Sequence, residues 1–117
     1  MPVLCDFKQI IGDDSQAIPV TAGAAEVPLP DFGTGGREAN ETALLIYSVR
    51  NMTGTAQVFI NGHHVGNITA SSGAVWSTQL IAVSGNSIRD GMNEIVLKNV
   101  TDAFSIKNLT CFFHQSS

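Results

Sequence analysis

Charged residues are scarce in this sequence, and basic residues are the scarcer kind. Six Lys and Arg stand against ten Asp and Glu in 117 residues, which gives a formal net charge of -4 and a charged fraction of 14%. A protein that binds a nucleic-acid backbone or an anionic membrane surface needs a cluster of basic side chains. The composition therefore predicts no nucleic-acid partner and no membrane partner.

Long apolar runs are also missing. No stretch approaches the roughly 20 consecutive apolar residues that cross a bilayer, and residues 1–6 show no basic region followed by an apolar one. We therefore expect no membrane span and no export signal in the sequence as given. This predicts a cytoplasmic location, unless a leader was removed before Met1.

Cysteine and histidine are too few to suggest a metal site. Two Cys and three His lack the number and spacing of zinc ligands. Cys5 and Cys111 are either two reduced thiols or a disulfide that joins the two ends of the chain, and a disulfide requires the first and last strands to be neighbours. Asp13 and Asp14 offer too few oxygens for calcium, which needs six to eight. We expect no metal and no other cofactor.

Catalytic signatures are absent as well. The sequence has no Gly-x-Ser-x-Gly nucleophile motif. Its Gly-rich segment 33–36 lacks the Lys and the following helix of a phosphate-binding loop. The ten acidic residues give no preferred pair for glycoside hydrolysis. These absences predict a protein that is not an enzyme.

Strand-forming residues are what the sequence has in abundance. It contains ten Ile, ten Val and nine Thr, with 11 Gly and eight Asn to form turns, and no helical stripe competes with the strand pattern. The predicted strands are 3–11, 17–20, 42–51, 56–60, 63–68, 75–83, 92–98 and 103–114. Segment 85–91 is expected to form one helical turn or a tight loop.

This pattern predicts an all-β fold, namely a single jelly-roll-like β-sandwich of two antiparallel sheets with seven or eight strands. We expect one domain, 1–117, with a long loop at 21–41 where the composition shifts to Ala, Gly and Pro. Strand alternation places a set of side chains in the core. The set is Leu45, Tyr47, Val49, Val58, Ile60, Ile81, Ile95 and Leu97.

Leu44 and Ile46 would then lie on the opposite face of their strand. Because both are apolar, we expect a loop or a neighbouring subunit to cover them, and this suggests self-association. A clean monomer at high concentration would remove that suggestion.

Two short patterns accompany the predicted strands. An apolar strand runs into Asn-Gly at 61–62 and returns through Val-Gly at 65–66, and a later loop ends in Gly-Met-Asn at 91–93. In these patterns the stretch 58–97, about a third of the chain, resembles the galactose-binding-like jelly-roll superfamily, most closely the non-catalytic sugar-binding module of family 2 glycoside hydrolases. The resemblance implies two antiparallel sheets packed face to face. The superfamily includes carbohydrate-binding modules, lectins and structural partners of catalytic domains.

Two functions are compatible with these observations. The first is a non-catalytic carbohydrate-binding module, and the alternative is a structural or interaction module that binds itself or a partner protein through an exposed sheet. A sugar site needs a ring for stacking and polar groups that fix hydroxyls. The candidate ligand-binding residues are Arg37, Arg50, His64 and Trp76.

Five Asn-x-Thr triplets, at Asn40, Asn51, Asn67, Asn99 and Asn108, are more than chance predicts. They indicate either glycosylation sites or the recurrence of Asn and Thr at strand ends.

Overall fold

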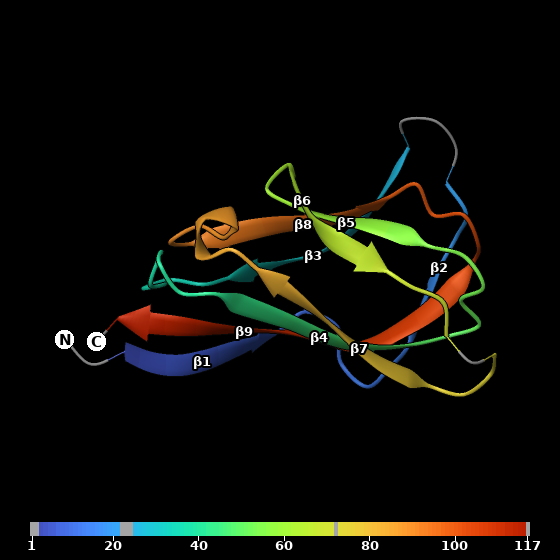
Figure 1. Cartoon of the computed structure of the whole chain (residues 1–117), viewed down its shortest axis with the longest axis horizontal. Coiled ribbons are helices and arrows are strands. Elements are labelled where there is room, and N and C mark those ends of the chain that lie inside the picture. The colour runs from blue at the N-terminus through green and yellow to red at the C-terminus, as the bar shows by residue number, and fades with distance from the viewer. Residues whose placement is uncertain (1–2, 22–24, 72, 117) are drawn as a thin grey trace.

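The computed structural model describes residues 3–21, 25–71 and 73–116. Their regular structure is nine strands and one short 3-10 helix (Figure 1). The strands are β1 (Val3–Gln9), β2 (Gln16–Ile18), β3 (Glu26–Gly33), β4 (Ala43–Arg50), β5 (Ala56–Ile60), β6 (His63–Ile68), β7 (Ser77–Val83), β8 (Met92–Lys98) and β9 (Phe104–Ser116). The 3-10 helix η1 (Gly85–Ser87) forms the helical turn expected between β7 and β8.

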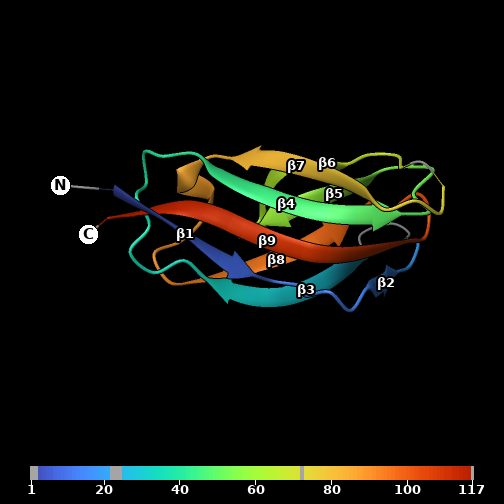
Figure 2. The same cartoon turned by 90° about the horizontal axis from the view of Figure 1, so that it is seen from below.

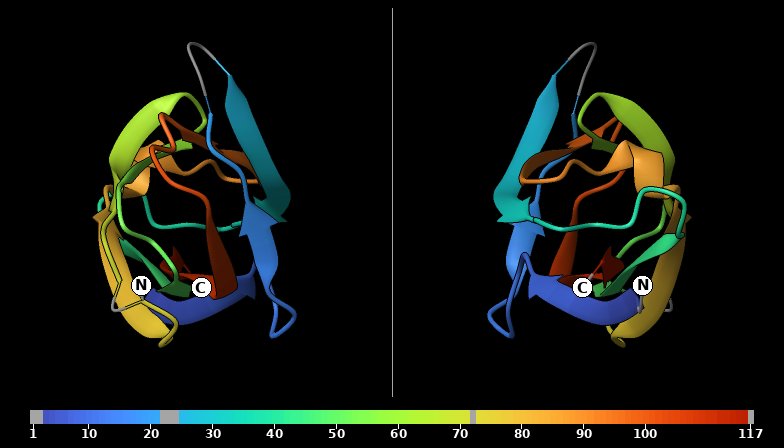
Figure 3. Two further views of the ribbon diagram at one scale, coloured as in Figure 1. Left: turned by 90° about the vertical axis from the view of Figure 1, so that its right-hand side faces the viewer. Right: turned by 90° about the vertical axis from the view of Figure 1, so that its left-hand side faces the viewer.

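The strands form two antiparallel sheets that pack face to face. The five-stranded sheet has the order β1-β9-β4-β7, with β2 also paired to β9, and the four-stranded sheet has the order β3-β8-β5-β6. Figure 2 looks onto the five-stranded sheet, and the end-on views of Figure 3 show the two layers. From β3 to β9 the chain crosses repeatedly between the sheets. The predicted all-β, jelly-roll-like sandwich is confirmed, although with nine strands among the described residues rather than seven or eight.

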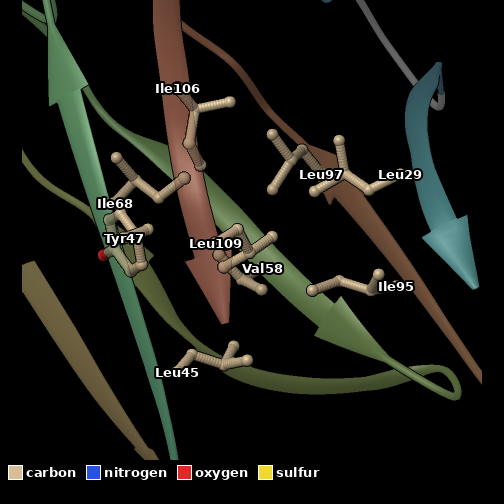
Figure 4. Close-up of a pocket in the computed structure, with 9 residues that line it drawn as sticks. All are labelled: Leu29, Leu45, Tyr47, Val58, Ile68, Ile95, Leu97, Ile106 and Leu109. Atoms are coloured by element: carbon tan, nitrogen blue, oxygen red, sulfur yellow. The ribbon is translucent and has the colours of Figure 1, made fainter. Parts of the chain in front are cut away.

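The space between the sheets is filled with apolar side chains. All eight side chains predicted for the core are buried, and Leu44 and Ile46 lie on the other face of β4 and are half-buried. Nine side chains from both sheets surround a cavity of about 10 Å³ between the layers (Figure 4). A space of this size barely admits one water molecule, so this cavity is too small for a ligand.

The prediction of a loop at 21–41 is wrong for part of this segment, because β3 lies within it. Pro28 and Pro30 give this segment the composition of a loop. They are tolerated in a strand here because β3 is an edge strand, paired with β8 on one side, where a missing N–H need not break a ladder. Residues 22–24 of the expected loop lie outside the described residues.

The two patterns behind the superfamily resemblance meet in the structure. The Asn61 side-chain amide donates a hydrogen bond to the Asn93 side-chain oxygen at 2.9 Å, and Asn93 is 1% exposed. The same Asn93 oxygen accepts from the backbone N–H of Arg89 at 2.6 Å. Both patterns therefore hold the turns at one end of the four-stranded sheet, which is a structural role.

The two cysteines are free thiols. Cys5 lies exposed on the edge strand β1, where it pairs with His114, whereas Cys111 is buried in the core. The first and last strands are neighbours, as a disulfide would require, yet the two thiols do not bond. Burial raises the pKa of the Cys111 thiol to about 12, which keeps it protonated and unreactive.

Several Asn residues of the Asn-x-Thr triplets adopt left-handed backbone conformations. Asn51, Asn99 and Asn108 have φ angles of 61°, 51° and 54°. Asn accepts such φ values more readily than most residues, since its short polar side chain bonds locally. Turn formation therefore accounts for three of the five triplets.

No helix in the described part of the chain is long and apolar enough to cross a membrane.

Candidate functional site

Arg50 and Trp76, two of the four predicted site residues, lie together at one end of the five-stranded sheet. The Arg50 guanidinium carbon lies 4.6 Å from the centroid of the Trp76 ring. Arg50 is the last residue of β4, and Trp76 precedes the first residue of β7, the strand that pairs with β4. The antiparallel register therefore brings the two side chains to the same end of the sheet.

Lys107 joins this pair, and sequence reasoning missed it. Its ammonium nitrogen lies 4.5 Å from the Trp76 centroid, so two cationic groups contact one indole ring. Lys107 pairs with Ser48 across β4 and β9, beside a register shift between Ile46 and Ser48. A contact that depends on such a shift gives no signal in the sequence. We call Arg50, Trp76 and Lys107 the basic–indole cluster.

One hydrogen-bond donor of Arg50 has no acceptor in the described part of the chain. Its Nε atom is buried without a hydrogen-bond partner among the described residues. Lys107, in contrast, lies 3.9 Å from the Asp13 carboxylate, which is 92% exposed. An ion pair at this distance whose carboxylate is open to solvent contributes little to stability.

A surface hollow of about 390 Å³ lies next to this cluster. It is lined by Ala17, Ile18, Pro19, Asn51, Ala103, Phe104 and Ser105. Asn51 directly follows Arg50 in the chain, and Ser105 is the register partner of Arg50 on β9. The hollow therefore begins on the side of Arg50 that faces β9, whereas Trp76 lies on the β7 side.

The structure places Arg37 and His64 elsewhere. The Arg37 side chain donates a hydrogen bond from Nε to the Ile88 carbonyl at 2.6 Å, which ties the segment before β4 to the β7–β8 connection. His64 lies on the other sheet, where its ring stacks on Phe59 at 5.1 Å between centroids and bonds to Asn67 at 2.8 Å. The four predicted residues therefore do not converge on one site.

The outer face of the five-stranded sheet carries two rows that are rich in apolar side chains. Cross-strand register puts Phe7, Phe112, Leu44 and Ala82 in one row, and Ile46 and Leu80 with the polar Gln9 and Thr110 in the next. The Phe7 and Phe112 rings lie 5.9 Å apart. Phe7 is 58% exposed, Leu80 63% and Phe112 41%. We call these two rows the apolar face; Figure 2 looks onto the strands that carry it.

Metal-binding groups do not gather in the described residues: no cluster of three or more His, Cys, Asp or Glu side chains is found there. The pKa of the Asp102 carboxyl group is lowered, because its carboxylate accepts hydrogen bonds from the Thr53 hydroxyl and backbone N–H. This contact joins two turns and lies on the surface.

Tyr47 provides a prediction for alkaline pH. Burial raises the pKa of its phenol above the ordinary value of 10.0, while its hydroxyl donates to Gln79 at 3.1 Å. The stability that the neutral phenol supplies is complete below about pH 10 and falls as the pH rises further, because only the unfolded chain ionises readily. Since the protein has one Tyr, absorbance at 295 nm during a pH titration should show phenolate forming together with loss of the β-sheet circular dichroism. Phenolate formation at about pH 10 with the fold intact would contradict this.

Comparison with known proteins finds no match, neither to a protein-family model nor to a curated protein. What the chain shares with the galactose-binding-like superfamily is therefore the coarse architecture, two antiparallel sheets packed as a sandwich.

Proposed function

We propose that this protein is a non-catalytic interaction module that self-associates through the apolar face. The observation that carries the proposal is the exposure of Phe7, Leu80 and Phe112 on one side of one sheet. Contiguous exposed apolar surface of this kind is typical of protein-interaction sites in water-soluble proteins. Half-buried Leu44 and Ile46 lie between these residues and extend the apolar surface.

The low charge of the face supports burial against another protein. Neither row of the apolar face contains a charged residue. On β4 and β9, Arg50 and Lys107 lie beyond the two rows in the basic–indole cluster, so the rows can lose their water without stranding an ion.

A second copy of the chain is the occupant that fits the size and chemistry of the face. The apolar face is two rows deep and four strands wide, so with strands about 4.8 Å apart and rows about 7 Å apart it presents roughly 250 Å² of projected surface. Two such faces in contact bury less than the roughly 1,000 Å² of a stable specific interface, which is the range of weak, transient association. We therefore expect a weak dimer, with a dissociation constant in the micromolar range or above.

Carbohydrate binding stays a prediction, as does membership of the galactose-binding-like superfamily. The sandwich architecture supports both. The positions of Arg37 and His64 give carbohydrate binding less support, and Trp76 has two cationic groups at its ring instead of a free stacking surface.

Sedimentation equilibrium over a wide concentration range tests self-association. We expect a monomer–dimer equilibrium for the unaltered protein and at least about tenfold weaker association for Leu80→Lys and Phe112→Lys, because each buries a charge in the dimer. Met92→Lys is the matched control: Met92 is 60% exposed but belongs to the other sheet, and its variant should associate normally. A monomer at all concentrations, or equal association of all three variants, would refute the proposal.

A further inference from the structure

The basic–indole cluster concentrates positive charge in an acidic protein. Both cationic groups lie about 4.5 Å from the same ring centroid, so the two charges are within about 9 Å of each other and repel. Asp13 faces Lys107, but among the described residues no carboxylate lies within 4.0 Å of Arg50. The Arg50 Nε is enclosed by protein atoms, so an external anion would bind to the terminal Nη atoms of the guanidinium. This arrangement leaves a place for an external anion.

We propose that Arg50 and Lys107 bind the carboxylate of a small acid whose apolar body occupies the adjacent hollow. A guanidinium matches a planar carboxylate with two parallel N–H donors, and such bonds are stronger than those between neutral groups. The ligand carboxylate replaces Asp13 at Lys107 at little cost, because the Asp13 side chain is 92% exposed and its carboxylate stays in water when it is displaced.

The lining of the hollow indicates the rest of the ligand. Five of its seven residues are apolar, and Asn51 and Ser105 supply the polar side chains. Its volume of about 390 Å³ falls within the range of small-molecule sites, about 300–1,000 Å³. A single six-membered carbocycle with one carboxylate combines the size, the apolar surface and the charge that these residues accommodate.

Trp76 makes the test direct, because it is the one Trp in the sequence. Its fluorescence and its indole N–H resonance both report on the cluster. We expect cyclohexanecarboxylate to change both signals saturably. Galacturonate has the same ring size and charge but carries hydroxyls, and cyclohexylmethanol has the ring without the charge; both should bind at least about tenfold more weakly. Acetate and inorganic phosphate test whether an anion alone is sufficient.

Variants separate the contributions of charge and geometry. Arg50→Met should weaken binding of cyclohexanecarboxylate at least about tenfold, the effect of losing a charge-assisted hydrogen bond. Arg50→Lys keeps the charge without the planar fork and should give an intermediate loss, and Lys107→Met should also weaken binding. Lys98→Met is the matched control, since Lys98 makes a similar contact with Phe59 on the other sheet, at 4.6 Å. Circular dichroism verifies that each variant is folded.

Three results would overturn the proposal. The first is the absence of any saturable change in either Trp76 signal with cyclohexanecarboxylate. The second is equal binding of cyclohexanecarboxylate and cyclohexylmethanol, which would show that the carboxylate does not contribute to binding. The third is equal binding of acetate, phosphate and cyclohexanecarboxylate, which would show that the hollow does not contribute to binding. Working below the concentration at which the protein associates keeps this test separate from that of the apolar face.

Discussion

Replacement of Asn93 by Ala should destabilise the protein by about 3–5 kcal/mol, because several buried groups lose their partners together. The Asn93 amide donates to the Thr34 hydroxyl at 2.8 Å and to the carbonyls of Phe32 and Gly91, both at 3.2 Å. Its oxygen accepts from Arg89 and Asn61. Urea denaturation followed by circular dichroism gives the free energy of unfolding.

Two further variants identify the cause of this loss. Asn86→Ala changes an exposed Asn of η1 and should alter stability by less than about 0.5 kcal/mol. Asn93→Asp keeps an acceptor but buries a carboxylate, whose pKa burial raises. Its stability should therefore be lowest at neutral pH and recover in part as the pH falls toward about 4, the ordinary pKa of Asp in the unfolded chain. An Asn93→Ala loss below 1 kcal/mol would show that the network is dispensable.

Gly85→Ala should be the second strongly destabilising change. Gly85 begins η1 and is buried, and a Cβ atom there would lie 2.4 Å from the Glu41 carbonyl oxygen and 2.5 Å from that of Ala39. Both are backbone atoms, so relief requires movement of the main chain. We expect a loss of about 3 kcal/mol, or a melting temperature lower by on the order of 10 °C.

Gly35→Ala is the control for this substitution. A Cβ at Gly35 would meet nothing within 4 Å, so thermal denaturation should give a melting temperature within about 2 °C of the unaltered protein. Equal melting temperatures for the Gly85 and Gly35 variants would mean that the segment before β4 moves freely away from η1.

Strand alternation predicted the core from the sequence because it depends on local geometry. In β4, for example, Leu45 and Tyr47 are buried while Leu44 and Ile46 face outward. Composition, in contrast, gave a wrong prediction for β3, where Pro28 and Pro30 imitate a loop. An edge position, which is a property of the whole sheet, makes these prolines acceptable, and a single sequence does not show which strands are edges.

The candidate sites were less predictable because they depend on contacts distant in sequence. Arg50 and Trp76 were singled out separately, but Lys107 joins them only through the register between β4 and β9. Phe7 and Phe112 likewise form one surface only because β1 pairs with β9. Arg37 was predicted to bind a ligand, yet its side chain holds two backbone segments together.

The central claim, that the apolar face is where two copies meet, is tested most directly by a dilution series observed through methyl NMR signals. We predict that the methyl resonances of Leu44, Ile46 and Leu80 shift with protein concentration while those of Val20 and Val75 stay constant. Val20 and Val75 are exposed but lie outside the apolar face. Constant Leu44, Ile46 and Leu80 resonances, or shifts confined to Val20 and Val75, would contradict the account.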